Sequence, residues 1–328
     1  MQAATRDNFR YLNREGRWAG FQWLGLELRD DGALRLSSMP ALPLPIDDAS
    51  ATETDAASAP SAPSGPAGIA VAADGSVYFT DPHGHRVLTV DACASGPRSV
   101  PCLGPNESDD AGVRSPRGLF IARHRPDLFI ADAGNERVLV VDPATWTIVD
   151  VWGDGLLREP WAIAGDDDGA IYVADRGTGR VHKFARSGDP VASFESNVYD
   201  SGLVTEPAGV AVSGDTIFIL DRASRTVVAC DRDGNGATVV VTAGTLDAPL
   251  AIAATATGRL LYAADAGLER ILVFRRIPAA APYELVGTAP GFEGFATALA
   301  VAANGDLLAL RPDGQPPIRL IAETGGGR

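Results

Sequence analysis

The best candidate for a metal site in this sequence is the segment at residues 231–236, Asp-Arg-Asp-Gly-Asn-Gly. It reproduces the first half of a calcium-binding loop, in which Asp231, Asp233 and Asn235 would supply the oxygen ligands that calcium prefers. An EF-hand loop also needs a glutamate at its twelfth position, where this chain has Thr242. Aspartate, asparagine and glycine also form tight turns. A calcium site and a turn between strands are therefore the alternatives, and we favour the turn.

Motifs of two large hydrolase classes are absent. The chain has no Gly-x-Ser-x-Gly nucleophile elbow and no His-Glu-x-x-His zinc motif. His83 and His85 stand two residues apart and could share a metal ion, but no cysteine or acidic residue stands at a spacing that completes a site. We therefore interpret both histidines as polar turn residues and assign no catalytic or cofactor-binding residue. The sequence leaves enzyme activity open and favours a protein that is not an enzyme.

Cys93 and Cys102 are the candidates for a disulfide. Eight residues separate them, and they fall on predicted neighbouring antiparallel strands, where a bridge is geometrically possible. In a reducing cytosol both would stay thiols, so the sequence leaves the two states open. Cys230 has no evident partner in the sequence.

These residues belong to a unit that repeats at intervals of 42 to 50 residues. Successive units begin at Pro66, Pro116, Pro160, Pro207, Pro249 and Ala296. Within each unit the apolar residues fall in runs of four to six, rich in valine and isoleucine and bounded by glycine, aspartate and proline. This pattern predicts four short strands per unit and not helices.

A repeat of this kind predicts an all-β fold, a six-bladed or seven-bladed β-propeller of four-stranded antiparallel blades, because sheets with two apolar faces must stack on one another. A solenoid is the rival architecture, which the antiparallel hairpins disfavour. The last unit lacks a fourth strand, so we expect the N-terminal segment, residues 9–18 or the hairpin at 23–36, to close the ring. The predicted organisation is a hairpin at 1–39, a flexible acidic linker at 40–65 and the propeller at 66–324.

The most regular charged positions are a repeated aspartate and a repeated arginine. The aspartates are Asp81, Asp132, Asp175, Asp221 and Asp265, and the arginines five residues later are Arg86, Arg137, Arg180 and Arg270. The fourth unit has Thr226 in place of the arginine, and the sixth has Arg311 in place of the aspartate. A charge-assisted hydrogen bond across the turn between them would make a structural clasp. Metal or substrate binding by these aspartates is the alternative, which their recurrence disfavours.

The order Pro-x-Gly-Ile/Leu, Tyr/Phe-x-x-Asp and Arg-Val resembles the NHL repeat over residues 66–322. A narrower resemblance rests on the N-terminal Phe-x-Trp-x-Gly-Leu-x-Leu hairpin, the acidic linker, and Cys93 with Pro-Cys-Leu-Gly at 101–104. These features resemble the phage-tail NHL proteins encoded with contractile injection systems. The resemblance implies a structural or adaptor component of a phage-tail-like particle, with other particle proteins as partners.

Charge and hydropathy limit the other partners. A net charge of −14 disfavours nucleic-acid and anionic membrane surfaces, because both need clustered lysine and arginine. No apolar run suits a signal peptide or a membrane span, so we expect a cytoplasmic protein with neither nucleic acid nor membrane as a partner.

These observations favour one function and leave two alternatives. The favoured function is a noncatalytic scaffold that binds partner proteins through loops at one end of the propeller, where Trp161 is either a recognition residue or a core residue. The first alternative is a metal-dependent, lactonase-like or lyase-like six-bladed propeller enzyme, although inner strands such as Gly-Ile-Ala-Val at 68–71 offer few metal ligands. The second is an RNA-binding NHL domain, which the acidic composition disfavours.

Overall fold

The computed structural model describes most of the repeat region and two short strands that precede it. The described residues are 23–28, 34–38, 67–90, 98–99, 112–122, 127–276, 283–289, 292, 294–303, 305–312 and 318–323. The predicted linker at 40–65 and the two cysteines Cys93 and Cys102 lie outside these residues. The domain division and the state of the two thiols therefore stay predictions.

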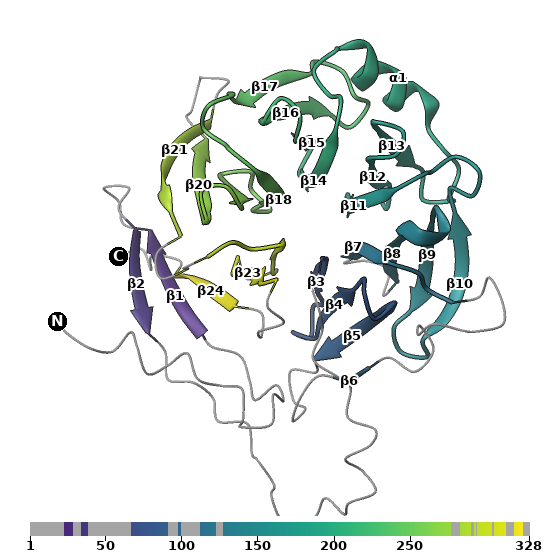
Figure 1. The fold of residues 1–328 in the computed structure, drawn as a ribbon, viewed down its shortest axis with the longest axis horizontal. Coiled ribbons are helices and arrows are strands. Elements are labelled where there is room, and N and C mark those ends of the chain that lie inside the picture. The colour runs from purple at the N-terminus through teal and green to yellow at the C-terminus, as the bar shows by residue number, and fades with distance from the viewer. Residues whose placement is uncertain are drawn as a thin grey trace, which may run out of the picture.

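Five blades are built from consecutive antiparallel strands and are set around a common axis (Figure 1). The first contains β3 (Ile69–Val71), β4 (Val77–Asp81), β5 (Arg86–Val90) and β6 (Arg98–Ser99), and the second contains β7 (Pro116–Ile121), β8 (Leu128–Asp132), β9 (Arg137–Asp142) and β10 (Thr147–Trp152). A short 3-10 helix, η1 (Ala133–Asn135), links β8 to β9.

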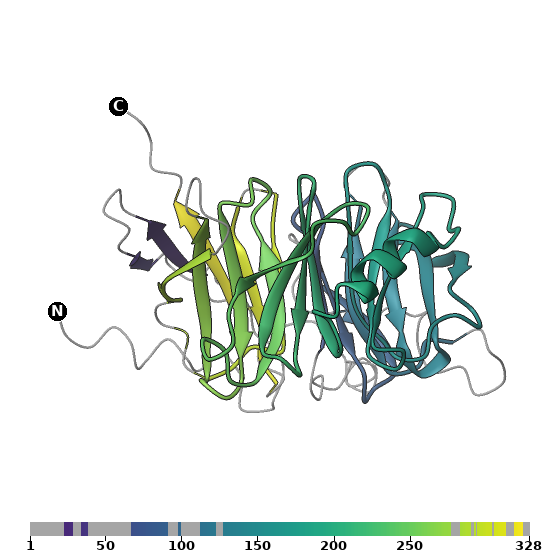
Figure 2. The ribbon, with the colours of Figure 1, turned by 90° about the horizontal axis from the view of Figure 1, so that it is seen from above.

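The other three blades follow the same order from the axis outward. The third contains β11 (Pro160–Gly165), β12 (Ile171–Asp175) and β13 (Arg180–Phe184), the fourth contains β14 (Pro207–Ser213), β15 (Thr216–Asp221), β16 (Thr226–Asp231) and β17 (Thr238–Val241), and the fifth contains β18 (Pro249–Ala254), β19 (Leu260–Asp265), β20 (Arg270–Arg276) and β21 (Tyr283–Thr288). Seen from the side, the blades form a disc (Figure 2).

In the third blade a helix takes the place of the outer strand. α1 (Ala192–Asp200) packs against β13, and its buried Phe194 and Val198 stand four residues apart on one helical face. The Phe194 ring meets Tyr172 of β12 edge-on, with ring centroids 5.2 Å apart. The expectation of four strands in every blade is therefore wrong here, because this apolar pair covers the sheet in a helical conformation. No helix among the described residues is long and apolar enough to cross a bilayer.

A sixth sheet joins the two ends of the chain. It contains β22 (Ala298–Val301), β23 (Leu307–Leu310) and β24 (Ile318–Glu323), and β24 pairs in parallel with β1 (Trp23–Leu28), which forms a hairpin with β2 (Leu34–Ser38). Two strands cannot form a stable sheet on their own, so the N-terminal hairpin extends the last unit and makes no separate blade. The prediction of six or seven equivalent antiparallel blades is corrected to five antiparallel blades and one mixed, five-stranded closing sheet.

The hydrophobic core lies between neighbouring blades. Tyr78 of the first blade packs with Leu128 and Ile130 of the second, and Phe79 packs with Leu308 of the closing sheet. The second strand of a blade, such as β4 or β12, is buried along its whole length because it faces a neighbour on both sides. This burial explains the continuous apolar runs of the sequence.

Close backbone packing explains the glycine that follows the opening proline. A Cβ atom on Gly68 would lie 2.0 Å from the carbonyl oxygen of Arg117 in the next blade, and one on Gly118 would lie 2.8 Å from the Ala162 Cα. The Thr80 hydroxyl also donates to the Arg117 carbonyl, at 2.8 Å. Neighbouring inner strands therefore meet through backbone atoms, which keeps the central channel narrow.

Candidate functional site

Each repeated aspartate ends the second strand of its blade, and all but Asp81 also hold the loop that leads into the inner strand. Asp221 is an example. Its Oδ2 accepts the backbone N–H groups of Thr205 and Glu206 at 2.6 and 2.7 Å, and its Oδ1 accepts the N–H and hydroxyl groups of Ser224, both at 2.8 Å. Thr205 and Glu206 directly precede Pro207, the first residue of β14. The carboxylate therefore joins the incoming loop to the turn after its own strand.

The other four aspartates are also buried and also accept backbone amides. Asp175 accepts the N–H groups of Arg158, Glu159 and Gly177, Asp265 accepts those of Asp247, Ala248 and Leu268, Asp132 accepts that of Arg114, and Asp81 accepts that of Gly84. Backbone amides are thus the partners that all five share, and the aspartates are anchors for the loops.

The predicted aspartate–arginine pair forms in the first two blades. Arg86 donates from Nε to Oδ2 of Asp81 at 3.0 Å, and Arg137 donates from Nε to Oδ2 of Asp132 at 2.9 Å. In these blades the arginine side chains are mostly buried against the carboxylates. A charge-assisted hydrogen bond of this kind contributes about 1.5 to 3 kcal/mol.

The third and fifth blades correct the predicted pairing. Arg180 forms its ion pair with Glu195 of α1, because the helix brings a carboxylate to the side of β13 that a strand would otherwise occupy. In the fifth blade Asp265 is held by the three amides described above, and Arg270 is exposed. The arginine therefore binds the anchor aspartate in some blades only, whereas backbone amides bind it in all five.

Two of the anchors have pKa values shifted in opposite directions. Burial raises the pKa of Asp132 above its ordinary value of 3.8, and hydrogen bonds from Arg114, Asn135 and Arg137 offset only part of the increase. Burial acts in the same sense on Asp221, but three backbone N–H groups and a serine hydroxyl lower its pKa below 3.8. Asp132 is the more buried of the two and accepts one backbone amide, whereas Asp221 accepts three, and the arginine beside Asp132 does not offset its burial.

The proline after each anchored loop determines where the next side chain points. Pro160, Pro207 and Pro249 each pair with the anchor aspartate of their blade, and the strand register shifts directly afterwards. Such a β-bulge turns its residue away from the ladder. The residues at these bulges are Trp161, Ala208 and Leu250, and all three line the central channel. We call this side of the disc, where Pro116, Pro160, Pro207 and Pro249 begin inner strands, the proline face.

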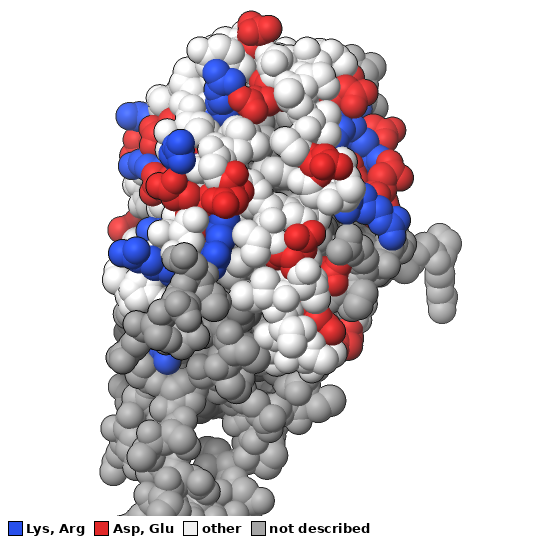
Figure 3. All heavy atoms as spheres, turned by 90° about the vertical axis from the view of Figure 1, so that its right-hand side faces the viewer, with Lys and Arg blue, Asp and Glu red and all other residues white. Residues whose placement is uncertain are grey.

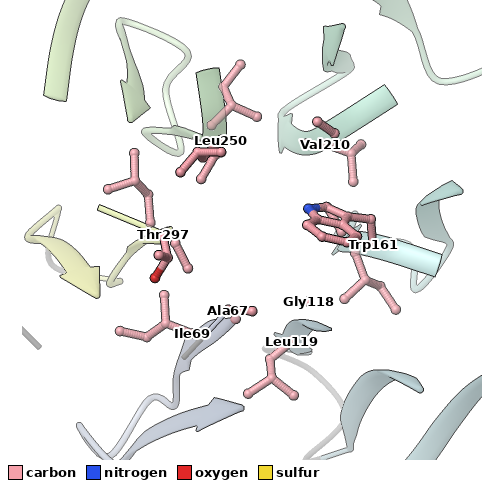
Figure 4. A pocket seen from close by; sticks show the side chains of 17 residues that line it. Ala67, Ile69, Gly118, Leu119, Trp161, Val210, Leu250 and Thr297 are labelled. Carbon is pink, nitrogen blue, oxygen red and sulfur yellow. The ribbon is translucent and has the colours of Figure 1, made fainter. Parts of the chain in front are cut away.

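The channel at the proline face is narrow and apolar (Figure 4). Glycine, alanine, valine, leucine and isoleucine from the inner strands line it, together with Thr297 and Trp161. It has room for a few water molecules. Figure 4 shows the Trp161 indole extending from β11 toward the middle of the opening. The channel mouth can therefore take a side chain of a partner more readily than a large substrate.

Trp161 is held by two arginines at the channel mouth. The guanidinium carbons of Arg117 and Arg176 each lie 4.1 Å from its ring centroid, within the range of a cation–π interaction. Arg117 lies in β7 of the neighbouring blade, and Arg176 directly follows β12 and pairs with Glu206 at 3.1 Å. Trp161 itself is half-buried. Its role, as a recognition residue or as a core residue, stays a prediction.

The predicted calcium ligands lie together in the turn between β16 and β17. Oδ1 of Asp231 accepts the N–H groups of Asp233 and Asn235 at 2.9 and 2.8 Å. Asp233 lies 3.4 Å from the Lys183 ammonium, and Oδ1 of Asn235 accepts a hydrogen bond from Asn197. These oxygens take part in the hydrogen bonds of the turn, and calcium binding there stays a prediction. Within the described part of the chain, no three His, Cys, Asp or Glu side chains are grouped closely enough to hold a metal ion.

His85 and Cys230 have structural environments. Nδ1 of His85 accepts the backbone N–H of Ser115 at 2.9 Å and so links the first blade to the loop before the second. Cys230 lies buried in β16, and burial raises the pKa of its thiol to about 12. The thiol is therefore protonated at neutral pH and a poor nucleophile.

Comparison with known proteins identifies the repeat and the fold. Residues 157–184, which span β11 to β13 and include Trp161, match the family model of the NHL repeat. The chain carries an NHL repeat. No curated protein sequence matches the chain.

Solved structures share the propeller fold at low sequence identity. A chain of a nidogen/laminin complex is 16% identical with a TM-score of 0.58, covering 84% of this chain and 94% of its own. A gluconolactonase from Xanthomonas campestris is 17% identical, with a TM-score of 0.55 and coverage of 75% and 83%. Virginiamycin B lyase from Staphylococcus aureus is 12% identical, with a TM-score of 0.54 and coverage of 79% and 85%. These likenesses show the fold alone.

Sequence analysis does not single out Arg117 or Arg176 as site residues. One signal was present for Arg117, because it follows Pro116 just as Trp161 follows Pro160. Arg176 directly follows the anchor Asp175, and nothing in the sequence marks it as a site residue. The contact of Arg117 with Trp161 depends on how two neighbouring blades pack, which the spacing within one unit does not encode, whereas Arg176 and Trp161 belong to the same blade.

Proposed function

We propose that the protein is a noncatalytic scaffold that binds partner proteins through the proline face. The observation that carries the proposal is the contrast between the aliphatic channel wall and the mouth above it, where Trp161 meets Arg117 and Arg176. Tryptophan and arginine are the residue types most enriched at the centres of protein interfaces. Catalysis in a channel needs reactive groups directed into it, and the described lining contributes the Thr297 hydroxyl and the Trp161 indole.

The disc is a rigid frame for such a surface. Interblade clusters of buried side chains fix neighbouring blades, and the anchor aspartates fix the loops of the proline face. Figure 3 views the rim and shows charged side chains gathered mainly toward the two faces of the disc, with mostly uncharged surface between them. The faces are therefore the polar surfaces on which specific recognition is expected.

We further propose that the partners are proteins of a phage-tail-like contractile particle, as the resemblance of the hairpin and linker implies. Purification of the tagged full-length chain from its native host, with Trp161→Ala as the matched variant, tests both proposals. Tube, sheath or baseplate proteins that co-purify with the wild type and are lost with the variant would support them. A reproducible partner of another kind would contradict the particle role alone, and no Trp161-dependent partner would contradict the scaffold.

A metal-dependent lactonase or lyase is the alternative function. It is favoured by the fold that the chain shares with the gluconolactonase and the virginiamycin B lyase. Lactone hydrolysis and lyase turnover are measured with the wild-type chain in the presence of added magnesium, calcium, manganese or zinc. Metal-dependent turnover that exceeds that of heat-treated protein would favour the enzyme over the scaffold.

A further inference from the structure

The two arginines at the channel mouth carry hydrogen-bond donors that the described residues do not use. Nε of Arg176 is buried and has no hydrogen-bond partner among them. The guanidinium of Arg117 is half-buried, stacks on Trp161, and donates no hydrogen bond to any residue that the structure describes. A guanidinium offers five N–H donors in a planar fork. Donors left without acceptors in a partly buried position favour a ligand that supplies the acceptors.

The charges at the mouth indicate the sign of that ligand. Burial lowers the pKa of Arg117; Glu159 opposes this shift and the nearby Arg176 adds to it. Both guanidinium groups stack on one indole ring, but Arg176 is paired with Glu206, whereas Arg117 forms no salt bridge with any residue that the structure describes. An anionic group beside Arg117 would balance its charge and accept its hydrogen bonds, and a carboxylate matches the planar guanidinium fork.

The walls beneath the arginines indicate what else the ligand must carry. Leu250, Ala208 and the Trp161 ring line the opening and are apolar. A peptide places carboxylates next to aliphatic or aromatic side chains, so it can cover both parts of the mouth. A nucleic acid carries a phosphate on every nucleotide, so a chain with a net charge of −14 repels it more strongly than a short segment with one or two carboxylates. An acidic peptide segment therefore fits the mouth better than a nucleic acid.

We propose that the channel mouth formed by Arg117, Trp161 and Arg176 binds an acidic segment of a partner protein through aspartate or glutamate carboxylates. The inference rests on the proposed scaffold function and names the chemistry of the partner. Arg117 takes the carboxylate, and Trp161, held by Arg176, keeps Arg117 in place and packs against the apolar part of the segment.

A peptide array probed with the purified full-length chain tests the proposal. The array carries random decapeptides that differ in their number of acidic residues, and the bound signal is expected to rise with that number. The strongest peptide and its counterpart with amides in place of the carboxylates are then titrated by calorimetry. The amide peptide is expected to bind about tenfold more weakly, and Arg117→Gln and Trp161→Ala are each expected to weaken the acidic peptide by about tenfold.

Arg158→Gln is the matched control. Arg158 also lies on the proline face, is 55% exposed in its side chain and pairs with Glu136 at 3.0 Å, so the variant removes the same charge without touching Trp161. We expect its affinity to stay within about twofold of the wild type, because exposed charges are screened by salt. Circular dichroism melting of all three variants shows that they are folded.

Three outcomes would overturn the proposal. One is an array signal that does not depend on acidic residues, and the second is equal affinity of the wild type and Arg117→Gln for the acidic peptide. The third is a single-stranded RNA oligonucleotide that binds the mouth more tightly than any acidic peptide and loses binding in the same variants. If a native partner still co-purifies with Arg117→Gln, the scaffold function stands and the acidic-segment inference fails.

Discussion

The anchor aspartates and the channel mouth belong to the same loops, but only the anchors repeat from blade to blade. Asp175 accepts the N–H groups of Arg158 and Glu159, and Trp161 follows them at the bulge. The bulge positions of the next two blades carry Ala208 and Leu250. The repeated residues therefore build the ring, and the residues that differ at equivalent positions give the mouth its chemistry.

If this contrast holds, substitutions at the repeated positions should destabilise the fold. We expect the largest loss of stability at the inner-strand glycine. Gly68→Ala would place a Cβ atom 2.0 Å from the Arg117 carbonyl oxygen, so the strands must separate. We expect a loss of about 3 kcal/mol in the free energy of unfolding, measured by denaturant titration. Gly209→Ala is the milder control, because its new Cβ would meet a side-chain atom of Ile252 at 3.0 Å. Equal stability of the two variants would contradict the account.

The anchor itself is tested by Asp221→Asn. Either orientation of the asparagine places its NH2 group against N–H donors, since Oδ2 faces Thr205 and Glu206 and Oδ1 faces Ser224. We expect a loss of about 2 to 3 kcal/mol, seen as a lower thermal midpoint. Asp215→Asn, at an ion-paired but 92% exposed carboxylate, should leave the midpoint unchanged. An Asp221→Asn variant as stable as the wild type would show that the loop does not depend on the hydrogen bonds between its backbone amides and the Asp221 carboxylate.

Much of this architecture was predictable because it is local. Alternating turn residues and valine-rich runs predict the strands, and the recurrence of Asp81, Asp132, Asp175, Asp221 and Asp265 predicts a structural role. The predicted arginine partner fails at Arg180, because α1 competes for it. Helix α1 itself follows from Phe194 and Val198 at helical spacing, a signal hidden among repeats with strand periodicity.

The channel mouth was less predictable because its contact with Arg117 joins different blades. Trp161 is visible in the sequence as an exception among the residues that follow the prolines. Its contact with Arg117 needs the close approach of inner strands, which the repeat suggests but does not measure. The completion of the last sheet by the N-terminal hairpin was predicted, but the parallel pairing of β1 with β24 was not, since it is a property of the closed ring.

Asp221 and Asp132 are two anchors whose pKa values shift in opposite directions, so their contributions to stability should depend on pH in opposite ways. The pKa of folded Asp221 lies below 3.8, so its ionised form adds stability above that pH, and the contribution is lost as pH falls through the folded value. The pKa of folded Asp132 lies above 3.8, so its ionised form opposes folding, and protonation at lower pH removes that cost. Thermal midpoints recorded from neutral pH to about pH 2 should show the deficit of Asp132→Asn growing at pH values above 3.8 and that of Asp221→Asn shrinking only below 3.8. Deficits that do not change with pH in either variant would contradict the directions of the two pKa shifts.

The smallest effect on stability is expected at the mouth. Trp161→Ala removes two cation–π contacts of a half-buried ring, and we expect a loss of about 1 kcal/mol. Arg117→Lys should cause an even smaller loss of stability, because the positive charge stays, although the planar guanidinium fork is lost. Denaturant titration of both variants checks this order, and a loss at Trp161 as large as that at Asp221 would place the tryptophan among the structural residues.

The most direct test measures stability and peptide binding on the same preparations of Asp265→Asn and Trp161→Ala, below the midpoint of the weaker variant. Asp265 accepts three backbone amides, from Asp247, Ala248 and Leu268, which lie outside the Arg117–Trp161–Arg176 cluster. We predict that Asp265→Asn melts at a clearly lower temperature but binds the acidic peptide like the wild type, and that Trp161→Ala melts near the wild type but binds about tenfold more weakly. If Asp265→Asn lost binding at an unchanged melting temperature, or Trp161→Ala lost stability but kept its affinity, the division between repeated anchors and a unique binding mouth would be contradicted.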